Sequence, residues 1–235
     1  MKTMWLRLQA PFAAFRYFQA GVYRATSPIM PPSVAYGLVL NLAAIEMRGS
    51  LSEISTPIRQ DIPKICLAIG TLSDPEKLEK SSLYQQLHSY PVGASGKEMS
   101  ARTHGAKFWI SPVRREFLVG LDLIIGVKTS DLEVLERVEQ GLAGKLNDSR
   151  YGLPFVGDNN FLFDRIDIIS EPLESVYWYE QMSANESPRK GSCRLTVGIN
   201  RTDSSKTTNK LFAPMLEKSK YPSEQAWTWT PSEIV

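Results

Sequence analysis

Residues 1–49 read MKTMWLRLQAPFAAFRYFQAGVYRATSPIMPPSVAYGLVLNLAAIEMRG, and this stretch decides the fold. Apolar and polar residues alternate over residues 4–10, which predicts a strand with one buried face. Pro32 marks the start of an apolar helix, because proline is tolerated in a first helical turn. The helix is expected to end near Gly49. Between the two elements, residues 12–24 form an irregular loop rich in aromatic and basic side chains.

Strands and one more helix follow along the chain. KICLAIGTL (64–72) and FLVGLDLIIGV (117–127) are near-continuous apolar runs of the kind found in central strands. Ser130 is a candidate N-cap for a helix, with Glu133 at the capping-box position, and the apolar stripe of that helix ends at Gly144. Additional strands are expected over residues 161–169, 176–182 and 194–199.

The resulting order is strand, helix, strand, insertion, strand, helix, strand. This is the split βαβ arrangement of ferredoxin-like domains, an α+β fold that RNA-recognition modules also use. We therefore predict a ferredoxin-like RNA-binding domain over residues 1–200, with residues 73–115 as an insertion that protrudes from the sheet. The insertion is expected to begin with a helix from Pro75 to Leu87. Residues 201–235 are expected to form an irregular polar tail.

Composition limits the classes of protein. The 235 residues are 43% hydrophobic and 22% charged, which suffices to bury a core and argues against disorder. Formal net charge is +2, so any affinity for nucleic acid must come from local clustering of cations. The sequence holds no apolar run of the roughly 18 residues that a membrane span needs. Cys66 and Cys193 lack the spacing of a zinc site, so we expect buried free thiols, no metal and a cytoplasmic setting without membrane contact.

Two basic segments are candidates for RNA contact. In the loop 12–24, Arg16, Tyr23 and Arg24 could hold phosphates and stack bases, whereas Phe12 and Phe15 suit a core position at the sheet edge. Residues 97–115 spread cations among small residues behind a Gly-Ser stretch, which predicts either an RNA-binding protrusion or an ordinary solvated loop.

Other motifs have competing interpretations. His104 and Lys107 with Tyr36 could form a metal-independent ribonuclease site, since such a site needs a general acid or base and a cation. The turns at Tyr151-Gly152 and at residues 157–160 could approach a phosphate chain through backbone N–H groups, or be ordinary turns. Asp158, Asp164 and Asp167 are close in sequence, but the last two fall on opposite faces of a strand and do not indicate a metal site.

Three stretches carry a resemblance to a known family. RLQAPFAAFR (7–16) and MPPSVAYGLVLNLAAIE (30–46) resemble the opening of the Cas-five family of CRISPR-associated proteins, which are RNA-binding subunits of type I Cascade complexes. RYGLPFVGDNNFLFDRI (150–166) is similar to the branch also described as fruiting-body developmental protein S. With the strand order, these stretches cover most of residues 1–170.

The resemblance implies a ferredoxin-like domain whose thumb, here residues 73–115, packs over RNA. It implies a subunit that caps the 5′ handle of the CRISPR RNA (crRNA) and contacts the terminal Cascade backbone subunit. It also implies contact with the large subunit, which reads the target DNA near the protospacer-adjacent motif, and no cofactor. The residues assigned to RNA are Arg16, Tyr23, Arg24, Lys97, Arg102, His104, Lys107, Arg114 and Arg150.

One branch of that family cuts precursor crRNA with a Tyr, a Lys and a His. Tyr36, His104 and Lys107 are the nearest candidates here, but Gly105 and Ala106 separate the histidine from the lysine, and the adjacent Lys-His pair of the cutting branch is absent. The prediction is therefore a non-catalytic subunit, with an endoribonuclease as the alternative.

Overall fold

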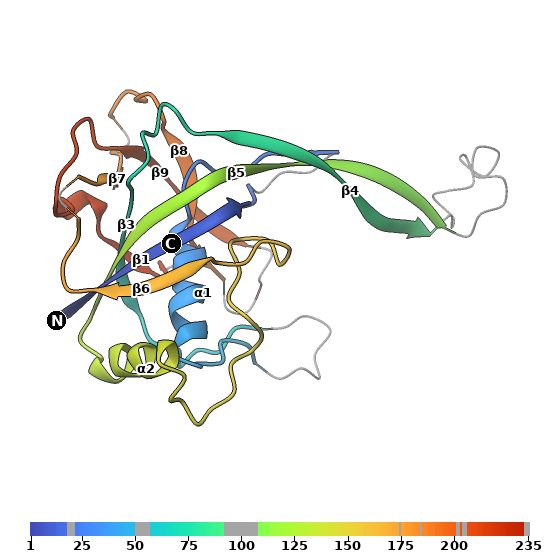
Figure 1. Ribbon diagram of the computed structural model, residues 1–235. Helices are drawn as coiled ribbons and strands as arrows, with labels where there is room; N and C mark the ends of the chain where they lie inside the picture. Colours follow the sequence, from blue (N-terminus) through green and yellow to red (C-terminus); the bar gives the residue numbers. More distant parts are fainter. Residues whose placement is uncertain are drawn as a thin grey trace.

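The computed structural model describes residues 1–17, 22–49, 57–91, 108–173, 175–183, 185–200, 203 and 206–232, and has the predicted α+β character (Figure 1). Its elements are, in chain order, β1 Lys2–Ala13, β2 Tyr23–Arg24, α1 Pro32–Leu42, β3 Ile65–Thr71, β4 Lys80–Pro91, β5 Phe108–Thr129, α2 Leu132–Leu142, β6 Arg165–Ile169, β7 Tyr177–Gln181, β8 Cys193–Ile199, β9 Thr207–Pro214, the 3-10 turn η2 Glu224–Ala226 and β10 Thr228–Thr230. Neither described helix is long and apolar enough to cross a membrane.

The centre of the molecule is an antiparallel sheet with the strand order β6-β1-β5-β3. Alternation in β1 and β5 sends Leu6, Leu8 and Ile125 to one face, where they join side chains of α1 and α2 in the main core. The expected strands at residues 4–10, 64–72 and 117–127 are thus confirmed, and both helices lie on the same face of the sheet.

The helices differ in how they are covered. Helix α1 is apolar almost all round because it packs against β3, against α2 and also against β8 from the C-terminal part of the chain. Helix α2 buries one stripe that includes Val134 and Val138. The two helices meet where Gly141 lies against the carbonyl of Leu42, a contact that leaves no room for a side chain at position 141.

Residues after 200 do not form the expected irregular tail. Strand β9 lies between β7 and β8, and β10 pairs with β3 from Thr228↔Leu67 to Thr230↔Ile65. Thr228 and Thr230 are buried in this pairing. The expectation was wrong because it treated polarity as a sign of irregular structure, whereas β-branched threonine fits a half-buried strand well.

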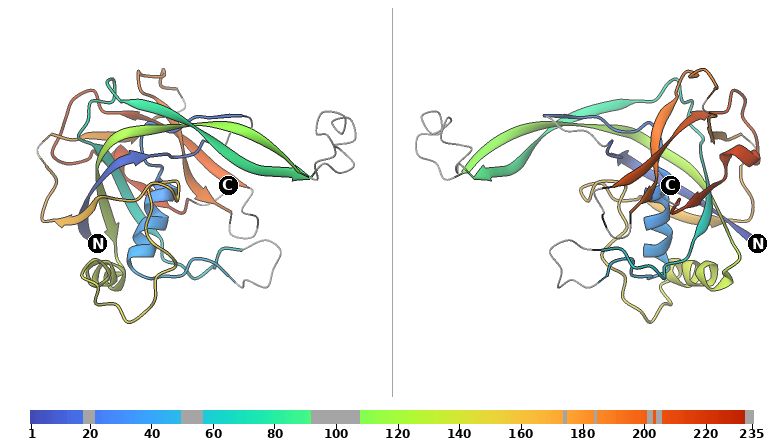
Figure 2. Two further views of the ribbon diagram at one scale, coloured as in Figure 1. Left: turned by 45° about the vertical axis from the view of Figure 1, so that its right-hand side comes forward. Right: turned by 180° about the vertical axis from the view of Figure 1, so that it is seen from behind.

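A long hairpin of β4 and β5 extends away from the body (Figures 1 and 2). The two strands pair from Lys80↔Leu118 to Pro91↔Phe108. The expected helix from Pro75 to Leu87 is therefore wrong. The segment forms a strand instead because β5 continues well past the body. The edge of β5 exposes backbone N–H and C=O groups there, and β4 supplies their hydrogen-bond partners.

Element boundaries also differ from expectation. Helix α2 begins at Leu132, and its N-cap is Asp131 rather than Ser130, since the Asp131 carboxylate accepts the N–H of Glu133. Helix α1 ends at Leu42, well before Gly49. Strand β6 starts only at Arg165, and before it Leu162 makes an isolated β-bridge with Phe155.

Candidate nucleic-acid interface

The short strand β2 lies against β5 at the base of the hairpin. It pairs in parallel, with Tyr23 opposite Arg114 and Arg24 opposite Arg115. The N–H of Arg114 donates to the carbonyl of Val22 at 2.7 Å. Residues from the aromatic-basic loop are therefore brought beside the arginines that precede the apolar part of β5.

Glu116 organises this junction. Its carboxylate accepts the Tyr23 hydroxyl at 3.0 Å, the Thr26 N–H at 3.0 Å and the Lys80 ammonium at 3.4 Å. The hydrogen bond to Glu116 raises the pKa of Tyr23. Of these three donors only Lys80 is charged, so the negative charge of Glu116 is balanced by Lys80.

Arg115 and Asp158 form an ion pair inside the protein. Arg115 is 6% exposed, and its Nη1 donates to Oδ2 of Asp158. The other carboxylate oxygen of Asp158 accepts the backbone and side-chain N–H groups of Asn160 at 3.0 and 2.7 Å. Burial lowers the pKa of Arg115, Asp158 opposes this, and the positive charges of Arg16 and Arg24 lower the pKa further.

The turn that carries Asp158 is anchored by backbone contacts. Gly157 has φ +78° and lies so close to the Ala14 carbonyl that a Cβ would sit 2.3 Å from that oxygen. The Ala14 N–H donates to the Val156 carbonyl at 3.1 Å. Phe15 is fully buried, and its N–H donates to Thr26 Oγ1 at 2.9 Å, which places Arg16 at the surface next to β2.

An aromatic cluster adjoins the same region. Phe12 and Phe117 meet edge to face at 5.3 Å between ring centroids, and both contact Phe161. Phe12 is nevertheless 41% exposed, so it is a partly solvent-facing edge of the core rather than an interior residue. Phe15, by contrast, has the core position expected for it.

Four of the residues assigned to RNA thus lie at the base of the hairpin: Tyr23 and Arg114 share one face of the β2–β5 pair, Arg24 shares the other face with Arg115, and Arg16 adjoins them through its bridge to Thr26. Arg150 does not join them, because its guanidinium donates to the carbonyl of Gly141 at the end of α2. Lys97, Arg102, His104 and Lys107 lie outside the described residues.

Sequence reasoning missed two members of the site. From the sequence, no joint role was predicted for Arg115 and Asp158. Arg115 belongs to the Arg-Arg-Glu run at 114–116, which comes directly before the apolar part of β5. Alternation along that strand was the available signal, since it turns Arg115 away from the face of its neighbours. Across the residues described, no three His, Cys, Asp or Glu side chains gather in a way that could hold a metal ion.

Tyr36 has a packing role. It is 4% exposed, and its hydroxyl donates to the carbonyl of Pro63 at 2.6 Å. The phenol is therefore largely withdrawn from solvent and held by the backbone.

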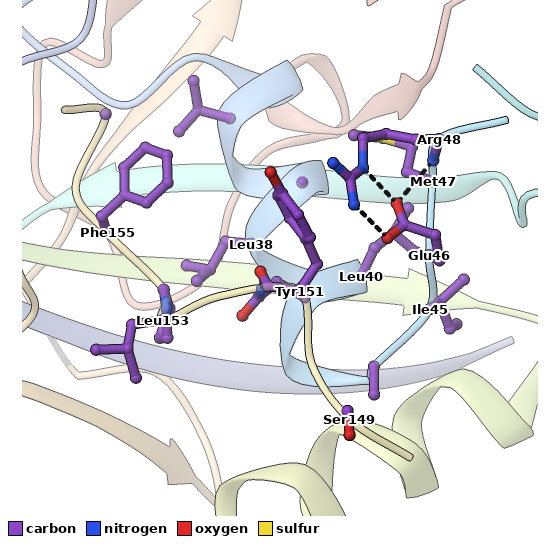
Figure 3. A pocket seen from close by; sticks show the side chains of 16 residues that line it. Leu38, Leu40, Ile45, Glu46, Met47, Arg48, Ser149, Tyr151, Leu153 and Phe155 are labelled. Atoms are coloured by element: carbon purple, nitrogen blue, oxygen red, sulfur yellow. Dashed lines mark hydrogen bonds and ion pairs between the residues drawn. The ribbon is translucent and has the colours of Figure 1, made fainter. Parts of the chain in front are cut away.

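A second feature is an apolar groove of about 360 Å³ between α1 and residues 149–157 (Figure 3). Tyr151 and Leu153 stand at its mouth, 67% and 73% exposed. The charges at its rim neutralise each other, since Arg48 pairs with Glu46 at 2.9 Å and stacks 3.2 Å from the Tyr151 ring centroid. The remaining lining is mostly apolar: Val34, Gly37, Leu38, Ile45, Met47 and Phe155.

The sheet face opposite the helices is covered by the chain itself. Trp5, Trp178 and Trp227 cluster there with ring centroids 5.8 and 5.9 Å apart, and Lys128 lies 4.0 Å above Trp227. The segment around η2 packs on this layer. RNA-recognition modules stack bases on an open sheet face, and here tryptophans occupy that surface.

Comparison with known proteins identifies the fold. Neither a family model nor a curated protein sequence matches the chain. Among solved structures, a chain described as "CRISPR RNA-guided surveillance complex" aligns with a TM-score of 0.59 and 12% identity over 96% of each chain. Another, described as "Crystal structure of Cas protein", reaches 0.49 with 11% identity over 93% of this chain and 96% of that one. At such identity, the first match shows a shared fold.

Proposed function

We propose that the protein is a non-catalytic subunit of a type I CRISPR surveillance complex, in which it binds and caps the 5′ handle of the crRNA. The observation that carries the proposal is that Arg16, Tyr23, Arg24 and Arg114 are brought together along the β2–β5 junction at the base of the hairpin. Arg114 beside the Tyr23 phenol, and Arg24 and Arg16 beside Arg115 on the other side of β2, suit a phosphate chain with exposed bases. Because the whole chain has a formal charge of only +2, this local grouping rather than bulk charge supplies the attraction.

The strand order supports the proposed family. The four central strands and two helices have the connectivity β1-α1-β3-β5-α2-β6 with the spatial order β6-β1-β5-β3, which is that of a ferredoxin-like sheet. The β4–β5 hairpin is then the thumb. A chain of a solved structure described as a CRISPR RNA-guided surveillance complex shares this fold over nearly its whole length.

The apolar groove supports membership of an assembly. Contiguous exposed apolar residues on a small protein mark interaction sites, and the internally paired rim of this groove offers nothing to a phosphate. We assign the groove to a protein neighbour, either the Cascade backbone subunit or the large subunit through which target DNA is reached. An apolar side chain of that neighbour would fill the space beside Leu38.

The alternative is an endoribonuclease that processes precursor crRNA. Burial of the Tyr36 hydroxyl supports the non-catalytic choice, because the alternative assigns that hydroxyl a chemical role. Incubation of the purified protein with repeat RNA in EDTA separates the two. We expect tight, salt-sensitive binding of handle-bearing RNA without a defined cut, and a cut that is lost in His104→Ala would overturn the proposal.

A further inference from the structure

We propose that Arg16, Arg24 and Arg115 form a subsite for a single backbone phosphate, with Asp158 as the positioning residue that holds Arg115 in place. This inference rests on the proposed function and sharpens it. It assigns one phosphodiester of the bound RNA to one side-chain cluster, and it gives a buried residue a share in recognition.

The first argument is the incomplete hydrogen bonding of Arg115. Arg115 is more than nine-tenths buried, and its Nε is shielded from solvent. This Nε nevertheless has no hydrogen-bond partner within the described part of the chain. Asp158 takes only Nη1. A buried donor without a partner is costly, and a ligand whose acceptor reached the guanidinium would remove that cost. The planar fork of arginine matches two phosphate oxygens.

The second argument is that Arg24 repeats the pattern. Its Nε is also shielded and without a partner in the described structure, and the β2–β5 register sets it directly beside Arg115. Arg16 joins the group through its bridge to Thr26, two residues after Arg24. Arg16 and Arg24 are close enough to Arg115 for their positive charges to lower its pKa.

The third argument concerns charge balance. The two carboxylates beside the cluster are already used, Asp158 by Arg115 and Asn160, and Glu116 by Tyr23, Thr26 and Lys80. Arg16 and Arg24 make no ion pair that the described residues reveal. The cluster therefore presents donors and unneutralised positive charge, which select an anion. Arg115 cannot reorient toward solvent while Asp158 holds it, so the anion must come to a fixed position.

The test is a scan of handle-bearing RNA in which each phosphodiester in turn is replaced by an uncharged methylphosphonate. Affinities are measured for the unchanged protein, for Arg24→Ala, and for Arg194→Ala as a matched control from the exposed face of β8. In the unchanged protein, we expect one linkage where the replacement costs about tenfold or more, as for a charged hydrogen-bonded contact. In Arg24→Ala that penalty should fall to about twofold, and in Arg194→Ala it should stay.

A second variant tests the contribution of the Arg115 guanidinium. Arg115→Lys keeps the charge but removes the fork, and we expect the same linkage to lose its penalty while the remaining linkages keep theirs. Because this residue is buried, Arg16→Ala at the surface provides a parallel readout that does not depend on core packing. It should likewise flatten the penalty and lower the slope of log affinity against log salt by about 1.

The outcomes separate the two levels of the argument. If the unchanged protein does not bind handle-bearing RNA, the proposed function fails. If it binds, but the penalty at every linkage is the same in Arg24→Ala as in the unchanged protein, the subsite is wrong and the proposed function stands. A penalty spread evenly over all linkages would also overturn the subsite, since it describes a diffuse basic surface.

Discussion

Arg115 on β5 and Asp158, 43 residues further along the chain, form an ion pair in the interior. The pair fastens the base of the protruding hairpin to the turn that follows residue 157. The same turn lies against the backbone of Ala14, so the ion pair also fixes where the aromatic-basic loop begins. One buried contact thereby sets the relative positions of three segments of the candidate interface.

The first prediction concerns the cost of breaking this pair. Asp158→Ala leaves the Arg115 guanidinium buried without its counter-ion, and we expect a loss of about 3–5 kcal/mol in the free energy of unfolding. The control is Asp122→Ala, which breaks a pair with Arg7 whose side chains are 22% and 32% exposed. Water compensates that loss, so about 1 kcal/mol is expected. Urea unfolding measures both, and equal costs would contradict the role assigned to burial.

The second prediction concerns Gly157. An alanine there would have to keep φ +78° and would place its Cβ 2.3 Å from the Ala14 carbonyl oxygen, so the turn must move. We expect Gly157→Ala to lower both the unfolding midpoint and the affinity for RNA, because Asp158 moves with the turn.

Gly152→Ala is the matched control for that change. Gly152 also has positive φ, at +67°, but nothing lies within 4 Å of its Cβ position. Only the conformational penalty of about 1 kcal/mol remains, and RNA affinity should not change. Loss of affinity in the Gly152 variant would show that strain alone, rather than the contact with Ala14, controls the site.

The third prediction concerns pH. Hydrogen bonds from Arg48 lower the pKa of Glu46 to about 2. A carboxyl with a lowered pKa stabilises the folded state at neutral pH, and this contribution is lost as pH falls from about 4.5 toward 2. Because the Glu46 side chain is 43% exposed, solvent screening keeps the effect below about 1 kcal/mol. Unfolding curves of Glu46→Gln should lose this component of acid sensitivity, and identical pH profiles would refute it.

Most of the fold was predictable because its elements carry local signals. The alternation in β1, the proline-opened start of α1 and the apolar runs of β3 and β5 each depend on neighbours in sequence. The hairpin strand β4 was not predictable from local signals, since its pairing is dictated by the exposed edge of β5. The pairs Arg24↔Arg115 and Arg115–Asp158 likewise depend on which segments meet in space. The sequence indicated the basic loop, and only the three-dimensional arrangement identified its partner arginine.

The fourth prediction tests the apolar groove as a protein contact. Leu153→Asp places a charge at the mouth of the groove, and because the side chain is 73% exposed, folding should be unaffected. We expect co-purification of the neighbouring subunits to fall at least tenfold while RNA affinity of the isolated protein is unchanged. Leu216→Asp, at an 81% exposed position outside the groove, is the control and should leave assembly intact. Equal recovery of the complex from both variants would remove the groove from consideration.

The last prediction decides which surface stacks bases. If RNA lay on the sheet face, as in RNA-recognition modules, Trp227 and its cation partner Lys128 would be its natural contacts. The structure instead packs Trp227 against Trp5 and Gly126, where a Cβ on the glycine would lie 2.6 and 2.8 Å from the two indole rings. Trp227→Ala should therefore cost about 3 kcal/mol of stability through lost packing and leave RNA affinity within about twofold.

Tyr23→Ala is the opposite case and completes the comparison. Its ring is 41% exposed and is held by Glu116, so its removal should cost little stability. Affinity for handle-bearing RNA should fall by about 1–3 kcal/mol if a base stacks on it. Thermal unfolding and filter binding on both variants measure the four quantities. A loss of affinity in Trp227→Ala that matches the loss in Tyr23→Ala would relocate the bases to the sheet face, because packing alone does not couple these two sites.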